Sequence, residues 1–203
     1  MALPTGGRAK VLARRGRQRI YTRQNAEKSG GRKVRFKKTK LKDCWLIEPE
    51  VFEDFRGEYT MTYSEKVFAE NGINVKFVED DISMSSRHVL RGIHGDQRTW
   101  KLISCPHGKF YFIVVNCDQQ SPDFGKWDSF TLSARNRNMV LVPPKHGNAH
   151  LVISESAIFH YKQSEYYNPE GQFTYLWNDP KFNIWWPVKN PMISRRDEEG
   201  HYV

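Results

Sequence analysis

This sequence has few cysteines and no long apolar run. Its three cysteines, Cys44, Cys105 and Cys117, are an odd number and include no CxxC pair, which argues against a disulfide framework. We expect each of them to pack as a small buried hydrophobe in a reducing compartment. No segment has the apolar length of a signal peptide or of a membrane span, so the sequence predicts a soluble, cytoplasmic protein.

Several enzyme signatures are absent as well. There is no GxSxG elbow and no cysteine next to an obvious base, which weighs against nucleophilic hydrolysis. Neither a P-loop nor a dinucleotide fingerprint is present. His146 and His150 are four residues apart, but the chain has no HxH pair and no carboxylate at ligand spacing from them, so we expect no bound metal.

Positive charge is concentrated at one end of the chain. Residues 1–40 hold 14 Lys and Arg and one acid, for a net charge of +13, whereas the remaining residues hold 18 bases and 22 acids, for −4. Like charges repel and the segment has few apolar residues, so we expect 1–40 to be a disordered extension and 41–203 to be one folded domain. An arm for non-specific nucleic-acid binding, a targeting segment and translated sequence upstream of the true start are the functional alternatives.

The body is a series of short apolar or alternating runs separated by turn residues. This pattern predicts an antiparallel sandwich or barrel, with one helix from Ser64 to Asn71. The expected strands are 45–47, 58–63, 75–82, 89–93, 101–105, 109–117, 129–132, 139–142, 150–153, 157–162 and 173–176.

His94 and Lys101 are the most informative pair of polar residues. His94 follows Arg91-Gly92-Ile93, and Lys101 begins the next expected strand. A neutral imidazole can take a carbon-bound proton near neutral pH, and a nearby ammonium can hold the oxyanion that results. The pair therefore suits proton abstraction beside a carbonyl, although a single histidine at a strand end is more often structural.

A set of motifs along the body resembles the dTDP-4-dehydrorhamnose 3,5-epimerase family in order and approximate spacing. The resemblance implies an all-β cupin jelly roll (a double-stranded β-helix) with few short helices, usually a homodimer, that acts on nucleotide-linked 4-keto sugars with neither metal nor organic cofactor. The motifs are Phe55-Arg56-Gly57-Glu58, Leu90-Arg91-Gly92-Ile93-His94, Lys101-Leu102, 121–127, Ala149-His150, Tyr161-Lys162, Tyr166-Tyr167-Asn168-Pro169, Trp177-Asn178-Asp179 and 193–197.

The resemblance also implies catalytic roles for four residues. His94 matches the base that removes the proton beside the C4 ketone, and Asp197 matches the carboxylate that orients this imidazole. Tyr161 matches the acid that returns a proton from the opposite face. Lys101 matches the donor to the enolate oxygen.

Further positions match substrate-binding residues of the family. Arg56 and Arg91 match guanidiniums that clamp the diphosphate, for which a planar fork is well suited. His150 and Tyr167 match other pocket positions. Glu79 and Asp81 occupy a run, Glu79-Asp80-Asp81, where the classical rhamnose enzyme has a Gln-Asp-Asn that helps to hold thymine.

Two other segments depart from the classical pattern. The loop over 95–100 is shorter than usual, and 143–150 reads Pro-Pro-Lys-His-Gly-Asn-Ala-His. Both resemble the branch that epimerises GDP-linked 4-keto heptoses, so the nucleotide, dTDP or GDP, and the sugar stay open.

Our main hypothesis is a cofactor-independent epimerase that inverts C3, C5 or both of a nucleotide-linked 4-keto sugar through an enolate. A ketoisomerase on the same scaffold and a non-catalytic nucleotide-sugar-binding cupin are the alternatives. The joint presence of His94, Asp197, Tyr161 and Lys101 favours catalysis over binding.

Overall fold

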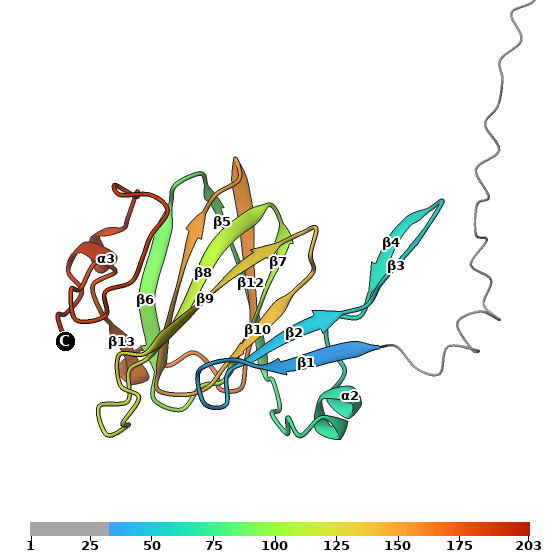
Figure 1. Cartoon of the computed structure of the whole chain (residues 1–203), viewed down its shortest axis with the longest axis horizontal. Helices are drawn as coiled ribbons and strands as arrows, with labels where there is room; N and C mark the ends of the chain where they lie inside the picture. The colour runs from blue at the N-terminus through green and yellow to red at the C-terminus, as the bar shows by residue number, and fades with distance from the viewer. Residues whose placement is uncertain (1–32) are drawn as a thin grey trace, which may run out of the picture.

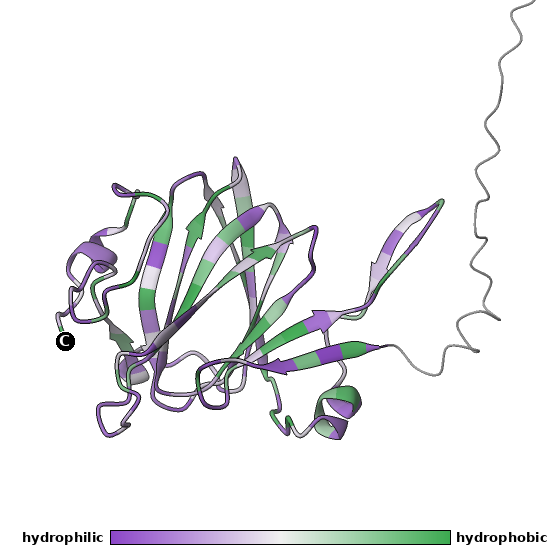
Figure 2. Cartoon of the chain, in the orientation of Figure 1, coloured by the Kyte–Doolittle hydropathy of each residue, from purple (hydrophilic) through white to green (hydrophobic). Residues whose placement is uncertain are grey.

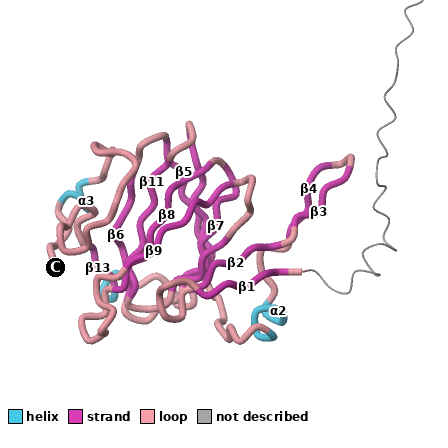
Figure 3. Tube along the Cα trace, in the orientation of Figure 1, coloured by secondary structure: helices cyan, strands magenta, loops and turns pink. Residues whose placement is uncertain are grey.

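The computed structural model describes residues 33–203, and the body of this part of the chain is built on two antiparallel sheets that face each other (Figures 1 and 3). One sheet has six strands, in the order β1 (Val34–Lys38), β2 (Trp45–Pro49), β10 (Met139–Val142), β7 (Lys101–His107), β12 (Ser156–Gln163) and β5 (Glu79–Ser86). The other has five strands, in the order β13 (Gln172–Thr174), β6 (Leu90–Asp96), β11 (His146–Val152), β8 (Lys109–Asn116) and β9 (Trp127–Ser133). The predicted all-β fold is confirmed.

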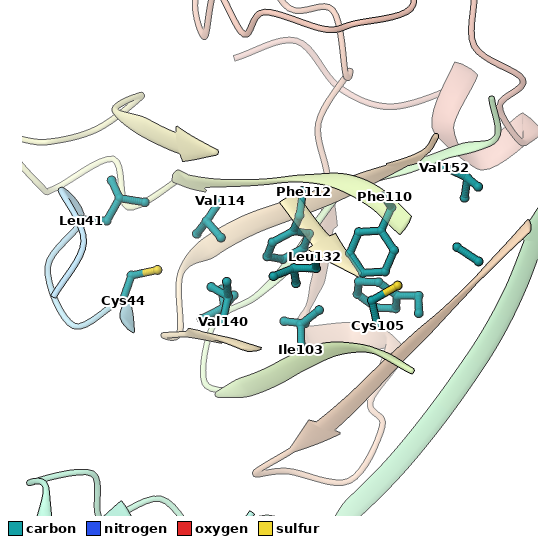
Figure 4. Close-up of a cluster of buried hydrophobic side chains, with 13 residues drawn as sticks. Leu41, Cys44, Ile103, Cys105, Phe110, Phe112, Val114, Leu132, Val140 and Val152 are labelled. Atoms are coloured by element: carbon teal, nitrogen blue, oxygen red, sulfur yellow. The ribbon is translucent and has the colours of Figure 1, made fainter. Parts of the chain in front are cut away.

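Strand β8 shows how the sequence builds the core. Alternate side chains of a strand point to opposite faces, and β8 is apolar on both. Phe110 and Phe112 point between the sheets, where they meet Ile103 of β7 and Val140 of β10 (Figure 4). Hydrophobic residues accordingly gather on the strands of both sheets, and hydrophilic ones are frequent in the connecting loops (Figure 2).

The outer faces of both sheets are partly covered. The helix α2 (Glu65–Glu70), which agrees with the predicted helix, places Phe68 against Ile47, Leu102 and Leu141 on the outer face of the six-stranded sheet. The C-terminal segment supplies Phe182, Ile184 and other apolar residues to the outer face of the five-stranded sheet and ends near α3 (Arg195–Glu198).

The predicted domain boundary at residue 40 is wrong in one respect. Residues 34–38, which we expected to belong to the disordered extension, form β1 and pair with β2 along its whole length. Val34 and Phe36 face the apolar cluster around Phe68, whereas Arg35 and Lys37 face outward and pair with Glu48. The basic residues at alternate positions masked the alternation of apolar and polar side chains that is typical of a strand. Residues 1–32 of the expected extension lie outside the described part of the chain.

A hairpin projects from the body (Figure 1). It consists of β3 (Val51–Asp54) and β4 (Gly57–Thr60), which form a separate two-stranded sheet. The hairpin lies on the side of the molecule opposite α3. This separation matters for the site, because the hairpin carries one of the two predicted diphosphate-binding arginines.

Candidate active site

The predicted base and its carboxylate partner are in direct contact. The His94 Nε2 atom on β6 lies 2.6 Å from Oδ1 of Asp197 on α3. Asp197 is 1% exposed and also accepts hydrogen bonds from the Gly92 amide at 3.2 Å and the Ser194 hydroxyl at 2.7 Å. Burial alone would raise the pKa of Asp197, but the hydrogen bonds from His94 and Ser194 hold it below its usual value. An ionised Asp197 fixes the proton on Nε2 and leaves Nδ1 of His94 as the basic nitrogen.

Glycine is required at position 92 for this contact. Gly92 has a φ of +120°, a conformation that L side chains rarely adopt, and a Cβ there would lie 2.5 Å from both the Ala149 Cβ and the Asn148 carbonyl oxygen. The Arg91-Gly92-Ile93-His94 motif therefore lets β6 approach β11 closely while it turns the Gly92 amide toward Asp197.

Tyr161 and Lys101 lie on the facing sheet. Tyr161 is on β12 and packs against the cluster between the sheets, and the Lys101 Nζ atom lies 5.7 Å from the centroid of its ring. Burial raises the pKa of Tyr161 to about 12, and the negative charge of Asp81 adds to this effect. Burial lowers the pKa of Lys101, and the negative charge of Asp96 partly offsets this effect. Tyr161 is thus held protonated, as a proton donor must be.

His150 connects the two sheets. It is 4% exposed and stacks on Phe159, with ring centroids 4.3 Å apart and planes inclined by 9°. Phe159 in turn contacts the Tyr161 ring at 5.4 Å. Burial and the nearby positive charge of Arg91 lower the pKa of His150 to about 3. His150 is therefore neutral near pH 7 and lines the interior between His94 and Tyr161.

The predicted acidic positions gather beside Tyr161. Asp81 is its direct partner on β5, and the two side chains hydrogen bond. The Gln163 amide donates to Glu79 and, at 3.3 Å, to Asp81. The backbone N–H of Tyr167 donates to Glu79 at 3.2 Å, while 60% of Tyr167 is exposed.

The two predicted diphosphate-binding arginines are not brought together. Arg91 lies on β6, the strand that also carries His94, and its Nε donates to Ser85 of β5 at 3.0 Å. Arg56 lies at the tip of the β3–β4 hairpin, where it pairs with Asp54 at 2.5 Å. The sequence motif gave no sign that these two arginines belong to distant parts of one chain.

Three residues near the site were not identified as candidates from the sequence. Asp96 accepts hydrogen bonds from Arg98 and Thr99, and its charge raises the pKa of Lys101. Arg196 acts in the opposite direction on Lys101, and Gln163 joins the acidic positions described above. Asp96 followed by a turn was a detectable signal, since aspartate often accepts from the backbone two residues on.

The structure offers no metal site within residues 33–203. No group of three or more His, Cys, Asp or Glu side chains there is arranged to hold an ion. His146 bonds through Nδ1 to the Pro144 carbonyl at 3.0 Å. No helix in the described residues is long and apolar enough to span a membrane.

Comparisons with known proteins identify the family to which the chain is similar. A family model described as dTDP-4-dehydrorhamnose 3,5-epimerase matches residues 38–203. An enzyme of that name from Shigella flexneri is 37% identical over 167 residues, which cover 80% of this chain and 92% of the relative.

Solved structures extend the likeness to the fold. The dTDP-4-dehydrorhamnose 3,5-epimerase of Elizabethkingia anophelis has a TM-score of 0.78 and 38% identity, covering 83% of this chain and 96% of that one. The dTDP-6-deoxy-D-glucose-3,5-epimerase of Legionella pneumophila, solved with dTDP-4-keto-L-rhamnose, has a TM-score of 0.80 and 31% identity, covering 84% and 93%. The predicted cupin jelly roll and the predicted family are confirmed, and the chain belongs to the dTDP-4-dehydrorhamnose 3,5-epimerase family.

Proposed function

We propose that this chain is an epimerase of a nucleotide-linked 4-keto sugar and inverts C3, C5 or both through an enolate. The observation that carries the proposal is the arrangement of two proton-transfer groups on facing sheets. His94, held by Asp197, lies on the five-stranded sheet, and Tyr161 lies with Lys101 on the six-stranded one. A flat enolate between them exposes one face to each group, which is the geometry that inversion requires.

The steps follow from the groups available. Nδ1 of His94 takes the proton from the carbon beside the ketone, and the electron pair of that C–H bond moves to the carbonyl oxygen. The Lys101 ammonium stabilises this oxyanion. Tyr161 then gives its proton to the opposite face of the carbon, and the C=O bond forms again. The ketone of the substrate serves as the electron sink.

We further propose that the active unit is a homodimer. The hairpin tip exposes Phe55, which is 91% exposed, next to Arg56. An apolar side chain and a guanidinium on a projecting arm suit a second copy of the chain, whose diphosphate site would gain Arg56. Sedimentation analysis of the purified protein tests the dimer, and a monomer with full activity would contradict it.

The deciding experiment incubates the protein with a panel of dTDP- and GDP-linked 4-keto sugars in deuterated water. NMR then locates the deuterium and the configuration of each carbon. Deuterium at C3 or C5 with inversion supports the epimerase, whereas movement of the ketone indicates the ketoisomerase. Binding without exchange for every sugar indicates the non-catalytic alternative.

We also propose a cytoplasmic location. Cys44, Cys105 and Cys117 are all buried free thiols, as in a reducing compartment.

A further inference from the structure

The side of the site that carries Tyr161 holds an unusual pair of carboxylates. On β5, Glu79 and Asp81 point inward and Asp80 points outward, because alternate residues of a strand face opposite sides. Asp81 is the direct cross-strand neighbour of Tyr161. Gln163, 3% exposed, bonds to both Glu79 and Asp81 and so fixes the two carboxylates beside each other.

The charges around Asp81 come from three strands. On its own strand lie Glu79 and Asp80, and on β12 lies Tyr161. On β7 lies Lys101, whose pKa is lowered by burial, an effect that the charge of Asp81 partly offsets. Burial and the negative charge of Glu79 raise the pKa of Asp81, and the hydrogen bond with Tyr161 acts in the opposite direction. The outward Asp80 is engaged elsewhere, at 2.5 Å from the His160 Nε2.

An ionised Asp81 would hinder Tyr161 as an acid. A phenolate formed there would stand beside two carboxylates, Asp81 and Glu79, both of which raise the pKa of Tyr161. A protonated Asp81 removes this obstacle, because it can donate to the phenolate oxygen as that oxygen becomes negative.

We propose that Asp81 is a positioning residue that acts through Tyr161, and that its protonated carboxyl replaces the proton Tyr161 gives to the enolate. The Tyr161 O–H bond breaks as the new C–H bond forms, and the Asp81 O–H bond breaks as the Tyr161 O–H bond forms again. Asp81 is left as a carboxylate and regains a proton from water, and His94 releases to water the proton that it took from the substrate, before the next turnover. This inference rests on the proposed epimerase function.

The test measures two quantities in deuterated water across a pH series from about 5 to about 9: deuterium exchange at the reacting carbon, and inverted product. Exchange reports removal of the proton by His94, and the ratio of inversion to exchange reports delivery by Tyr161. We expect this ratio to fall by up to about tenfold per pH unit above the pKa of Asp81 in the wild-type protein.

Three variants separate the roles. Asp81→Asn keeps the shape but has no proton to give, so the ratio should be about tenfold lower at the acidic end and independent of pH. Glu79→Gln removes the charge that raises the pKa of Asp81, so the fall in the ratio should move to lower pH. Ser86→Ala is the control at an exposed, uncharged position of the same strand, and its ratio should fall with pH as in the wild type.

Each result tests either the role of Asp81 or the epimerase function on which it rests. An Asp81→Asn protein that keeps the wild-type pH dependence overturns the role of Asp81, and so does a Glu79→Gln protein with no shift. If Asp81→Asn does not fold, Glu79→Gln still provides the test. Absence of exchange in the wild type with every sugar would instead contradict the epimerase function.

Discussion

The two sides of the candidate site hold their carboxylates in opposite ways. Asp197, beside His94, accepts hydrogen bonds from a ring nitrogen, a backbone amide and a hydroxyl, and its pKa is lowered. Asp81, beside Tyr161, shares its surroundings with Glu79, and its pKa is raised. The first arrangement stabilises a fixed negative charge, and the second favours a carboxyl that can be neutral. The same type of residue is thus easier to ionise on one side of the site and easier to protonate on the other, because its neighbours differ.

The largest expected effect comes from breaking the base side. His94→Ala removes the only imidazole bonded to Asp197 and should abolish deuterium exchange at every carbon, a loss of at least about 10³-fold. Exchange followed by NMR in deuterated water measures this directly. His107→Ala, at an exposed histidine on the same sheet as Tyr161, is the control and should keep full exchange. Wild-type exchange in His94→Ala would show that the base lies elsewhere.

Breaking the acid side should have a different signature. Tyr161→Phe deletes the proton donor and leaves His94 and Asp197 in place, so exchange should continue while inverted product falls by about 10²-fold or more. The ratio of inversion to exchange is the measurement. An equal loss of both would make Tyr161 a packing residue, as its contact with Phe159 alone would suggest.

Asp197 should affect kcat through its negative charge. Asp197→Asn keeps the size of the side chain but no longer fixes the proton on Nε2 of His94, so kcat should fall by about 10²-fold with little change in KM. Steady-state kinetics provide the values. Glu198→Gln, on the same short helix, is the matched control. An unchanged kcat in Asp197→Asn would show that the contact with His94 has no catalytic role.

The comparison of the two carboxylates can be sharpened by titration. As pH falls, Asp81 should take up its proton first and Asp197 last, because their pKa values are shifted in opposite directions. The lowered pKa of Asp197 stabilises the folded state above the unfolded-state pKa of about 3.9, and this contribution is lost as pH falls through the folded-state value. Carboxyl NMR shifts across an acidic pH series measure both groups. The reverse order would contradict the comparison.

How much of the site the sequence could predict depends on how far apart in the chain the contacting residues lie. His94 and Lys101 were identifiable from residues close together in the chain. The contact between His94 and Asp197 spans 103 residues and was accessible only through the family resemblance. Arg56 matched its motif, but no local pattern indicates that β3 and β4 project from the body.

Strand prediction failed where charge or packing masked the period. Arg35 and Lys37 concealed the inward Val34 and Phe36 of β1. The expected strand over 75–82 begins only at Glu79, because Val75 and Phe77 pack in the cluster around α2 without joining a sheet. Apolar residues at the right spacing predict burial more reliably than they predict a hydrogen-bonded partner.

The smallest expected effect tests whether any chemistry belongs to the N-terminal extension. Every residue of the two contrasted sides lies between Glu79 and Asp197, so deleting residues 1–32 should change kcat and KM by no more than about twofold. It should also weaken any salt-sensitive retention on heparin, since residues 1–32 hold nine of the 14 bases of residues 1–40. Steady-state kinetics and heparin chromatography measure these two expectations.

A longer deletion, of residues 1–40, provides the contrast. It removes β1, so the inward faces of Val34 and Phe36 are lost from the cluster around Phe68, and the edge of β2 is exposed. Full burial of one such side chain contributes about 1.5–3 kcal/mol, and Val34 and Phe36 are both partly buried, so this protein should melt at a lower temperature than the one lacking 1–32. Equal melting temperatures would show that β1 adds nothing to stability. A salt-suppressed rise in KM after deletion of 1–32 alone would show instead that the basic segment attracts the anionic substrate, and would extend the site beyond its two sheets.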